Sequence, residues 1–135
     1  AGSVAARRSS YRKLYEGLKG MPGLILPVAE ENSDASWFGF LIAVRDGVGF
    51  TRNELTGFLE NRKIQTRNLF AGNLIKHPAF DEMRRTGEGY RVVGELTNTD
   101  FIMNNGFWIG VYPGMSSEMI DWMTASIREF CETRK

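Results

Sequence analysis

The sequence has few of the residues that build disulfides and metal centres, and its positive and negative charges nearly cancel. Cys131 is the single cysteine and His77 the single histidine, which excludes an internal disulfide, a cysteine zinc cluster and a pair of imidazoles. The 17 basic and 16 acidic residues leave a net charge of +1, which argues against bulk binding of nucleic acid. No apolar run approaches the roughly 20 residues that span a bilayer, and no signal peptide is visible. We therefore expect a cytoplasmic protein with no metal site, no membrane segment and no nucleic-acid partner.

Recognisable catalytic motifs are also absent. There is no glycine-rich phosphate loop of standard spacing and no G-x-S-x-G elbow. The run GLKGMPG lacks the preceding strand that a nucleotide loop requires, so a turn is the better interpretation. The paired carboxylates Glu30-Glu31 and Asp81-Glu82 are typical of solvated loop charges. The residues alone therefore predict no catalytic machinery.

What is present is the pattern of one ordinary globular domain of 135 residues, 42% hydrophobic and 24% charged. Three segments carry apolar residues at helical spacing. The first lies near residues 11–18, and the second follows a capping box formed by Thr51 and Glu54. The third is capped by Ser116. The residues expected to form the three buried stripes are Tyr11, Leu14, Tyr15 and Leu18; Leu55, Phe58 and Leu59; and Met119, Ile120, Met123, Ile127, Phe130 and Cys131.

The strand signals lie between these helices. Residues 37–45 are apolar on both faces and predict a central strand, 63–70 an edge strand, and 107–112 a second core strand. Glycines and a proline interrupt residues 71–93, which predict a long irregular loop. A short helix capped by Thr97 or Asn98 follows it. We therefore expect an α+β fold, with helices packed on a small, mainly antiparallel sheet.

A few polar and aromatic residues are candidates for ligand binding. Arg67 opens the long loop, where a guanidinium could bind a phosphate or carboxylate; the alternative is a surface ion pair. Phe70, Asn73 and Phe80 share the loop and could form a sugar or nucleotide surface by stacking and hydrogen bonding. The alternative is that the phenylalanines pack the loop onto the core.

Two neighbouring asparagines, Asn104 and Asn105, stand at the entrance of the second core strand. They could bind something polar, or they could end the preceding helix, because asparagine tolerates the left-handed C-cap conformation. Trp37 and Trp108 are expected to belong to the core, as are the methionines of the last helix.

Several runs together resemble a known family. They are EENSDASWFGFLIAV, TRNELTGFLENRKIQTRNLFAGNLIKHPAF and YRVVGELTNTDFIMNNGFWIGVYPGM. The chain is similar, over nearly its whole length, to the C-terminal domain of the DegT/DnrJ/EryC1/StrS sugar aminotransferase-like family, which shares the aspartate-aminotransferase fold. Within that family it most resembles the pyridoxamine-phosphate-dependent dehydratases that remove the 3-hydroxyl of CDP-4-keto-6-deoxyglucose in deoxysugar and lipopolysaccharide O-antigen biosynthesis.

The resemblance implies that residues 4–135 are the small domain of a longer enzyme whose large domain carries the cofactor site. The chain starts AGSVAARRSS without a methionine, so residues 1–3 could be a remnant of a tag. The cofactor would be pyridoxamine 5'-phosphate or pyridoxal phosphate, held outside this chain, and a histidine in the large domain would replace the usual lysine. His77 does not match that position. The implied partners are a nucleotide-sugar substrate, an iron–sulfur flavin reductase and a second subunit of a homodimer.

The resemblance also implies which residues close the cleft. Trp37, Phe38, Arg67, Phe70 and Asn73 would face the cofactor and the nucleotide sugar, with Asn104 and Asn105 near the cleft between the domains. The chain alone is then expected to be inactive and to bind pyridoxamine phosphate weakly or not at all.

Two other functions stay open at this point. The chain could be the small domain of a sugar aminotransferase that uses pyridoxal phosphate, or a free-standing α+β ligand-binding module. A small domain predicts an exposed apolar patch where another part of the protein docks.

Overall fold

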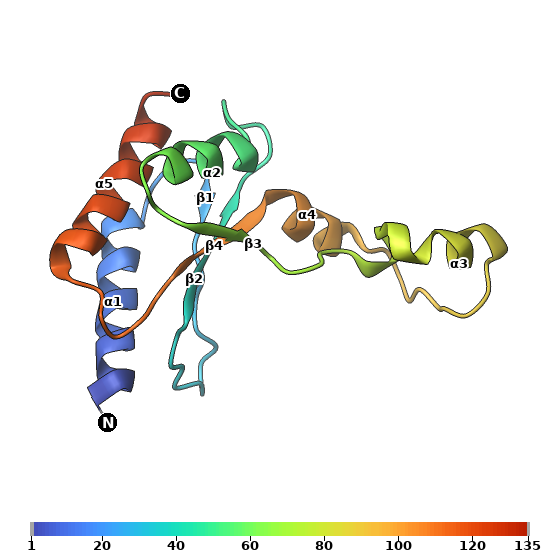
Figure 1. The fold of residues 1–135 in the computed structure, drawn as a ribbon, viewed down its shortest axis with the longest axis horizontal. Coiled ribbons are helices and arrows are strands. Elements are labelled where there is room, and N and C mark those ends of the chain that lie inside the picture. Colours follow the sequence, from blue (N-terminus) through green and yellow to red (C-terminus); the bar gives the residue numbers. More distant parts are fainter. Residues whose placement is uncertain (1, 135) are drawn as a thin grey trace.

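The computed structural model describes residues 2–134 as a compact body from which a long arm projects (Figure 1). The four strands are β1 (Leu24–Ile25), β2 (Gly39–Val44), β3 (Thr66–Asn68) and β4 (Gly106–Gly110). The helices are α1 (Gly2–Leu18), α2 (Arg52–Asn61), α3 (Asp81–Thr86), α4 (Thr97–Asn105) and α5 (Ser117–Glu132), with 3-10 turns η1 (Leu74–Lys76) and η2 (Pro78–Phe80). Gly2 and Ser3 belong to α1, while Ala1 lies outside the described residues.

The strands form one sheet in the order β1-β2-β4-β3, and every neighbouring pair is antiparallel. The predicted α+β architecture is confirmed. The predicted strands 37–45 and 107–112 are both present in shorter form, as β2 and β4, and they take the two central places. β3 is an edge strand, as predicted.

One face of the sheet is covered by helices, and it forms the core. Phe40 and Ile42 of β2 and Phe107 and Ile109 of β4 are fully buried on this face, because alternate residues of a strand point to the same side. The residues of α1, α2 and α5 that pack against them are Leu14, Leu18, Leu55, Leu59, Ile120, Ile127 and Phe130. Burial raises the pKa of the Cys131 thiol in this core to about 11.

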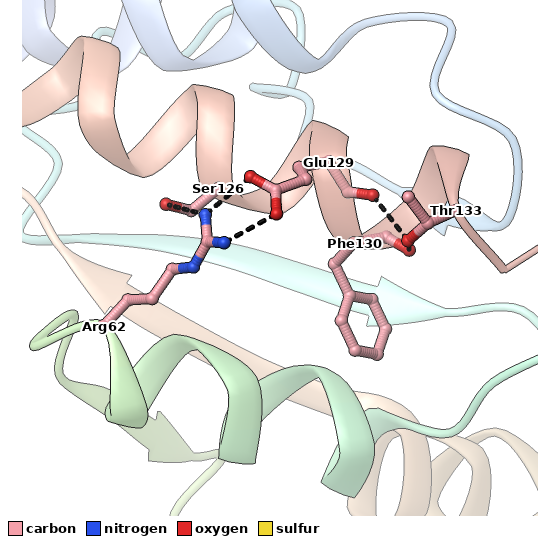
Figure 2. Close-up of polar contacts among 5 residues, drawn as sticks. All are labelled: Arg62, Ser126, Glu129, Phe130 and Thr133. Carbon is pink, nitrogen blue, oxygen red and sulfur yellow. Dashed lines mark hydrogen bonds and ion pairs between the residues drawn. The ribbon is translucent and has the colours of Figure 1, made fainter.

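Local signals positioned two of these helices as predicted. The Thr51 N–H donates to Glu54 Oε2 at 2.8 Å, and the Glu54 N–H donates to Thr51 Oγ1 at 3.2 Å, which completes the capping box. The Met119 N–H donates to Ser116 Oγ at 3.2 Å at the start of α5. Tertiary contacts join the two helices. Arg62, the residue after α2, donates to the Glu129 carboxylate of α5 from both Nη1 and Nη2 (Figure 2).

The arm consists of residues 69–105 and includes η1, η2, α3 and α4 (Figure 1). The prediction of an irregular loop over 71–93 was wrong for residues 81–86, which form α3 and end at Gly87 in the left-handed conformation, φ 73°. The predicted cap of α4 was also wrong. The N-cap residue of α4 is Leu96, and no side chain forms a capping hydrogen bond at this end of the helix.

None of the helices described between residues 2 and 134 is long and apolar enough to cross a membrane. Within the same residues, no three histidine, cysteine, aspartate or glutamate side chains gather in a way that could hold a metal ion.

Candidate functional site

The sheet face opposite the helices carries the candidate site. The register places Leu41 of β2, Trp108 of β4 and Arg67 of β3 side by side in one row on this outer face. Gly39 and Gly110 form the neighbouring pair of the same face. A row that runs from an aliphatic to an aromatic to a cationic side chain suits a ligand with both apolar and anionic parts.

Phe38 and Phe70 meet at Trp108. The Phe38 ring stands edge-on to the Trp108 ring, with centroids 5.0 Å apart. A shallow hollow of about 110 Å³ is lined by these three aromatic residues together with Gly39, Leu41 and Leu69. Phe38 is 60% exposed and Phe70 is 78% exposed, so the alternative that Phe70 packs the loop onto the core was wrong. These aromatic side chains gather around one hollow of the outer face.

Trp108 carries an unpaired hydrogen-bond donor. Its Nε1 is shielded from solvent, and it has no hydrogen-bond partner within the described residues. A buried donor without an acceptor lowers stability, and such groups usually indicate a missing partner. The indole lies so close to β2 that a Cβ on Gly39 would be 2.7 Å from Trp108 Cε3. The ring position is therefore set by close packing.

Arg67 lies next to Trp108 but lines a second hollow, of about 450 Å³, on the β3 side of the sheet. Both Arg67 and Lys63 of this hollow lack an ion pair with any acidic residue in the range 2–134. The surface ion pair that sequence reasoning offered as the alternative for Arg67 is therefore not formed. The guanidinium is left available for an anion from elsewhere.

Trp37 and Asn73 lie away from this face. Trp37 is half-buried and stacks on Tyr11 of α1, with ring centroids 4.3 Å apart. Asn73 is 2% exposed, and its Nδ2 donates to Asp100 Oδ1 at 2.8 Å. The hydrogen bonds from Lys76, at 2.8 Å, and from Asn73 lower the pKa of Asp100. In this structure both residues hold elements together.

Asn104 and Asn105 are the last two residues of α4, as one interpretation of the sequence expected. Gly106, which follows them, has extended backbone with φ −90°, so the left-handed cap expected of asparagine is not used. Asn105 Nδ2 donates to the Val44 carbonyl at 2.7 Å and to Asp46 Oδ1 at 2.8 Å. Asn104 is exposed. Both asparagines line a polar hollow near the loop after β2, apart from the aromatic hollow.

Arg52 is a positioning residue that sequence reasoning missed. Its Nη1 donates to the Gly106 carbonyl at 2.8 Å and to Asn68 Oδ1 at 3.0 Å, which ties the start of α2 to β3 and β4. Partial burial lowers the pKa of this guanidinium. The only signal in the sequence was an arginine directly after the capping threonine.

Among the described residues, those that line the aromatic hollow include no acid, base or nucleophile. The aromatic hollow is lined by aromatic and aliphatic residues and glycine, and His77 is exposed on the arm. The arrangement can bind, orient and shield a ligand whose reacting atoms are held by other groups.

Two curated proteins match nearly the whole chain. The chain is 52% identical, over 93% of its length, to a dTDP-4-dehydro-2,6-dideoxy-D-glucose 3-dehydratase of Saccharopolyspora spinosa. It is 48% identical, over 94% of its length, to the lipopolysaccharide biosynthesis protein RfbH of Salmonella typhimurium. It covers 26% of the first relative and 28% of the second, so it spans about a quarter of the curated relatives it matches.

Solved structures confirm the fold. DesV of S. venezuelae superimposes with a TM-score of 0.79 at 22% identity, covering 96% of this chain and 32% of DesV. The E. coli GDP-4-keto-6-deoxy-D-mannose-3-dehydratase with bound hydrated PLP gives 0.77 at 22% identity, over 92% of this chain and 30% of that enzyme. A model of the DegT/DnrJ/EryC1/StrS aminotransferase family matches residues 2–128. The chain therefore belongs to the DegT/DnrJ/EryC1/StrS aminotransferase family.

Proposed function

We propose that this chain is the small C-terminal domain of a nucleotide-sugar 3-dehydratase that depends on pyridoxamine phosphate. Its substrate would be a nucleoside-diphosphate 4-keto-6-deoxyhexose, with CDP-4-keto-6-deoxyglucose as the predicted form. The product would enter deoxysugar biosynthesis, including that of lipopolysaccharide.

One observation carries this proposal: a relative named as a 3-dehydratase is 52% identical to this chain over 126 aligned residues, which make up 93% of the chain. That relative acts, by its name, on a dTDP sugar, so the reaction at C3 is better supported than the identity of the nucleotide. The exposed aromatic face of the sheet also supports the proposal, because it gives the large domain and the substrate a surface to close against.

Pyridoxamine phosphate, when bound, supplies the amine and the electron-withdrawing ring that make loss of the C3 hydroxyl feasible. The residues of this chain fit a surface that closes over such a group, because Phe38, Phe70 and Trp108 line an apolar hollow on the outer face of the sheet. Phe38 and Phe70 would exclude water from the closed cleft. Trp37, Asn73 and Asn105 would position the surrounding elements, and Asn104 would stay near the cleft edge.

Partners follow from the same proposal. The large domain that holds the cofactor would belong to the same polypeptide, and two polypeptides would form a homodimer. An iron–sulfur flavin reductase would supply the electrons that complete 3-deoxygenation.

The reaction can be tested in the full-length protein by oxygen exchange. Loss of water from C3 is reversible, so the protein loaded with pyridoxamine phosphate should transfer ¹⁸O from labelled water to C3 of the substrate. The ketone oxygen exchanges without enzyme, and mass spectrometry must therefore find a second label that is absent without the cofactor. Failure to find this second label with either the CDP or the dTDP sugar would overturn the proposed function.

A sugar aminotransferase is the second candidate, because solved neighbours such as TlmJ of Streptoalloteichus hindustanus, with a TM-score of 0.78 over 97% of this chain, are aminotransferases. This function requires pyridoxal phosphate and an amino donor such as glutamate. A 4-amino sugar formed from those reagents, together with no ¹⁸O at C3, would establish it instead.

A further inference from the structure

The second hollow, beside the edge strand β3, has walls of unusual composition. It measures about 450 Å³, a volume within the usual range for small-molecule sites. The lining includes the aromatic residues Trp108, Tyr112 and Trp122 and the cations Lys63 and Arg67, with no acidic residue. Trp122 is 50% exposed and Tyr112 is 44% exposed. Exposed aromatic side chains that gather in one hollow, rather than singly, are typical of a binding site.

The aromatic walls are held in place although they are exposed. Trp122 Nε1 donates to the Arg62 carbonyl at 3.3 Å. Arg62 is in turn fixed by its two bonds to Glu129 (Figure 2). The Tyr112 hydroxyl lies 3.9 Å from Met119 Sδ, a weak contact for the second ring. Rings that are already ordered lose little entropy when a flat ligand stacks on them.

Lys63 and Arg67, the cations of the hollow, form no ion pair within residues 2–134. Glu60, the residue that lies on α2 near Arg67, uses Oε1 to accept from the Thr66 N–H at 2.5 Å and from the Thr66 hydroxyl at 2.8 Å. Those two bonds lower the pKa of Glu60. Lys63 is held in the left-handed backbone conformation, with φ 64°. The lining of the hollow therefore carries two cations and no carboxylate, while Glu60 outside the lining offsets part of the charge of Arg67.

Trp108 adds a donor to the same wall. Its Cε3 edge packs over Gly39 of β2, so Nε1, on the opposite edge of the indole, is turned away from β2. β3 flanks β4 on that opposite side. Nε1 is shielded from solvent, so a phosphate oxygen in the hollow reaches this donor only if the indole turns toward it.

We infer that this hollow binds the nucleoside diphosphate part of the substrate, with the base stacked on Trp122 or Tyr112 and the phosphates bound by Arg67 and Lys63. This inference rests on the proposed function, which supplies the nucleotide. The chemistry recognised is an aromatic ring joined to a phosphate, and pyridoxamine phosphate shares it. The size of the hollow and its paired rings and cations favour the larger ligand.

The test titrates the 135-residue chain, labelled with ¹⁵N, with CDP and dTDP and follows amide resonances. Saturable shifts are expected at residues 63–67, 108–112 and 119–123. Separate titrations use cytidine, which has no phosphate, inorganic pyrophosphate, which has no base, and pyridoxamine phosphate. Each should bind at least about tenfold more weakly than CDP. Cytidine loses the charged hydrogen bonds to the cations, and pyrophosphate and pyridoxamine phosphate lose the stacked base.

Two substitutions and one control assign the contacts. Arg67→Gln should weaken CDP about tenfold, and Trp122→Leu should weaken it by a similar factor. Arg91→Gln makes the same change of charge on the exposed arm and should leave the affinity unchanged. Circular dichroism checks that the variants stay folded. Absence of saturable binding, equal losses for Arg67→Gln and Arg91→Gln, or equal affinity for pyridoxamine phosphate would each overturn the inference.

The inference and the proposed function fail in different ways. Binding of CDP at these residues without ¹⁸O exchange by the full-length protein would overturn the function and leave the nucleotide site standing. Exchange at C3 with an unchanged KM in the Arg67→Gln variant would overturn the site and leave the function standing.

Discussion

Arg62 and Glu129 join the end of α2 to the last turn of α5 by two parallel hydrogen bonds. Nη1 lies 2.7 Å from Oε2 and Nη2 lies 2.6 Å from Oε1 (Figure 2). The guanidinium also lies 4.3 Å above the Phe58 ring. The pair thus connects two helices whose buried stripes lie side by side, and it supports the carbonyl that holds Trp122.

This pair predicts a specific dependence of stability on pH. The hydrogen bond from Arg62 lowers the pKa of Glu129 below its ordinary 4.5. A lowered folded-state pKa means that the stabilisation is complete above the unfolded value and is lost as pH falls through the folded value. Glu129→Gln should be less stable than the native chain near neutral pH, and the difference should shrink well below 4.5. Urea unfolding of both chains, near neutral pH and well below pH 4.5, measures this difference in unfolding free energy.

The native chain and the Glu129→Gln variant must be compared at each pH, because other carboxylates also change stability with pH. Glu54 and Asp100 are among those whose pKa values are lowered. Their contributions cancel in the difference between the native chain and the variant. A difference in unfolding free energy that stays constant over this pH range would contradict the role given to the pair.

Gly39 is required by the Trp108 ring. A Cβ at residue 39 would lie 2.7 Å from Trp108 Cε3, so Gly39→Ala should displace the indole and cost about 1–3 kcal/mol of unfolding free energy. Tryptophan fluorescence of the folded chain should change at the same time. Chemical unfolding followed by circular dichroism measures the free energy.

Gly57 provides the matched control. It lies exposed within α2, and nothing stands within 4 Å of a Cβ built there. Gly57→Ala should stabilise the chain by roughly 0.5–1 kcal/mol, because alanine has the higher helix propensity. If both alanine variants shifted stability in the same direction, close packing at Gly39 would not be the cause.

Alanine substitutions of the neighbouring residues Asn104 and Asn105 should lower the free energy of unfolding by very different amounts. Asn105→Ala removes the hydrogen bonds to the Val44 carbonyl and Asp46 and should cost roughly 1–2 kcal/mol. Asn104→Ala removes an exposed side chain and should change the free energy of unfolding by less than about 0.5 kcal/mol. Equal losses in thermal or urea unfolding would show that the two bonds of Asn105 contribute nothing.

Asn73 should control the order of the arm. Asn73→Ala removes the bond to Asp100 that joins the first and last parts of residues 69–105. Hydrogen exchange of amides in η1 and α4 should speed up, while exchange in β2 and α5 should stay the same. Asn98→Ala, an exposed asparagine on α4, is the control. Faster exchange throughout the chain would instead mean that Asn73 stabilises the whole domain.

Much of the fold could be predicted from local patterns. The capping box at Thr51 and the cap at Ser116 start α2 and α5, because hydrogen bonds between near neighbours need no distant contact. α3 was missed because its glycine and proline neighbours hide a six-residue helix. Met119, expected in the core, is 42% exposed because its position lies at the edge of the apolar stripe, where packing partners decide the outcome.

Part of the candidate site could likewise be predicted from the sequence, and part could not. The sequence alone determined that the chain is an α+β domain of this family, with Phe38, Phe70 and Arg67 as candidate contacts, since periodicity and motifs are local. Only the tertiary structure decided that these residues share the sheet face around Trp108, while Asn73 and Asn105 hold the arm and a loop. The reason is register: β2 and β4 are apolar on both faces, so the pairing of the strands, not the order of residues along them, selects which side chains are buried and which lie exposed on the outer face.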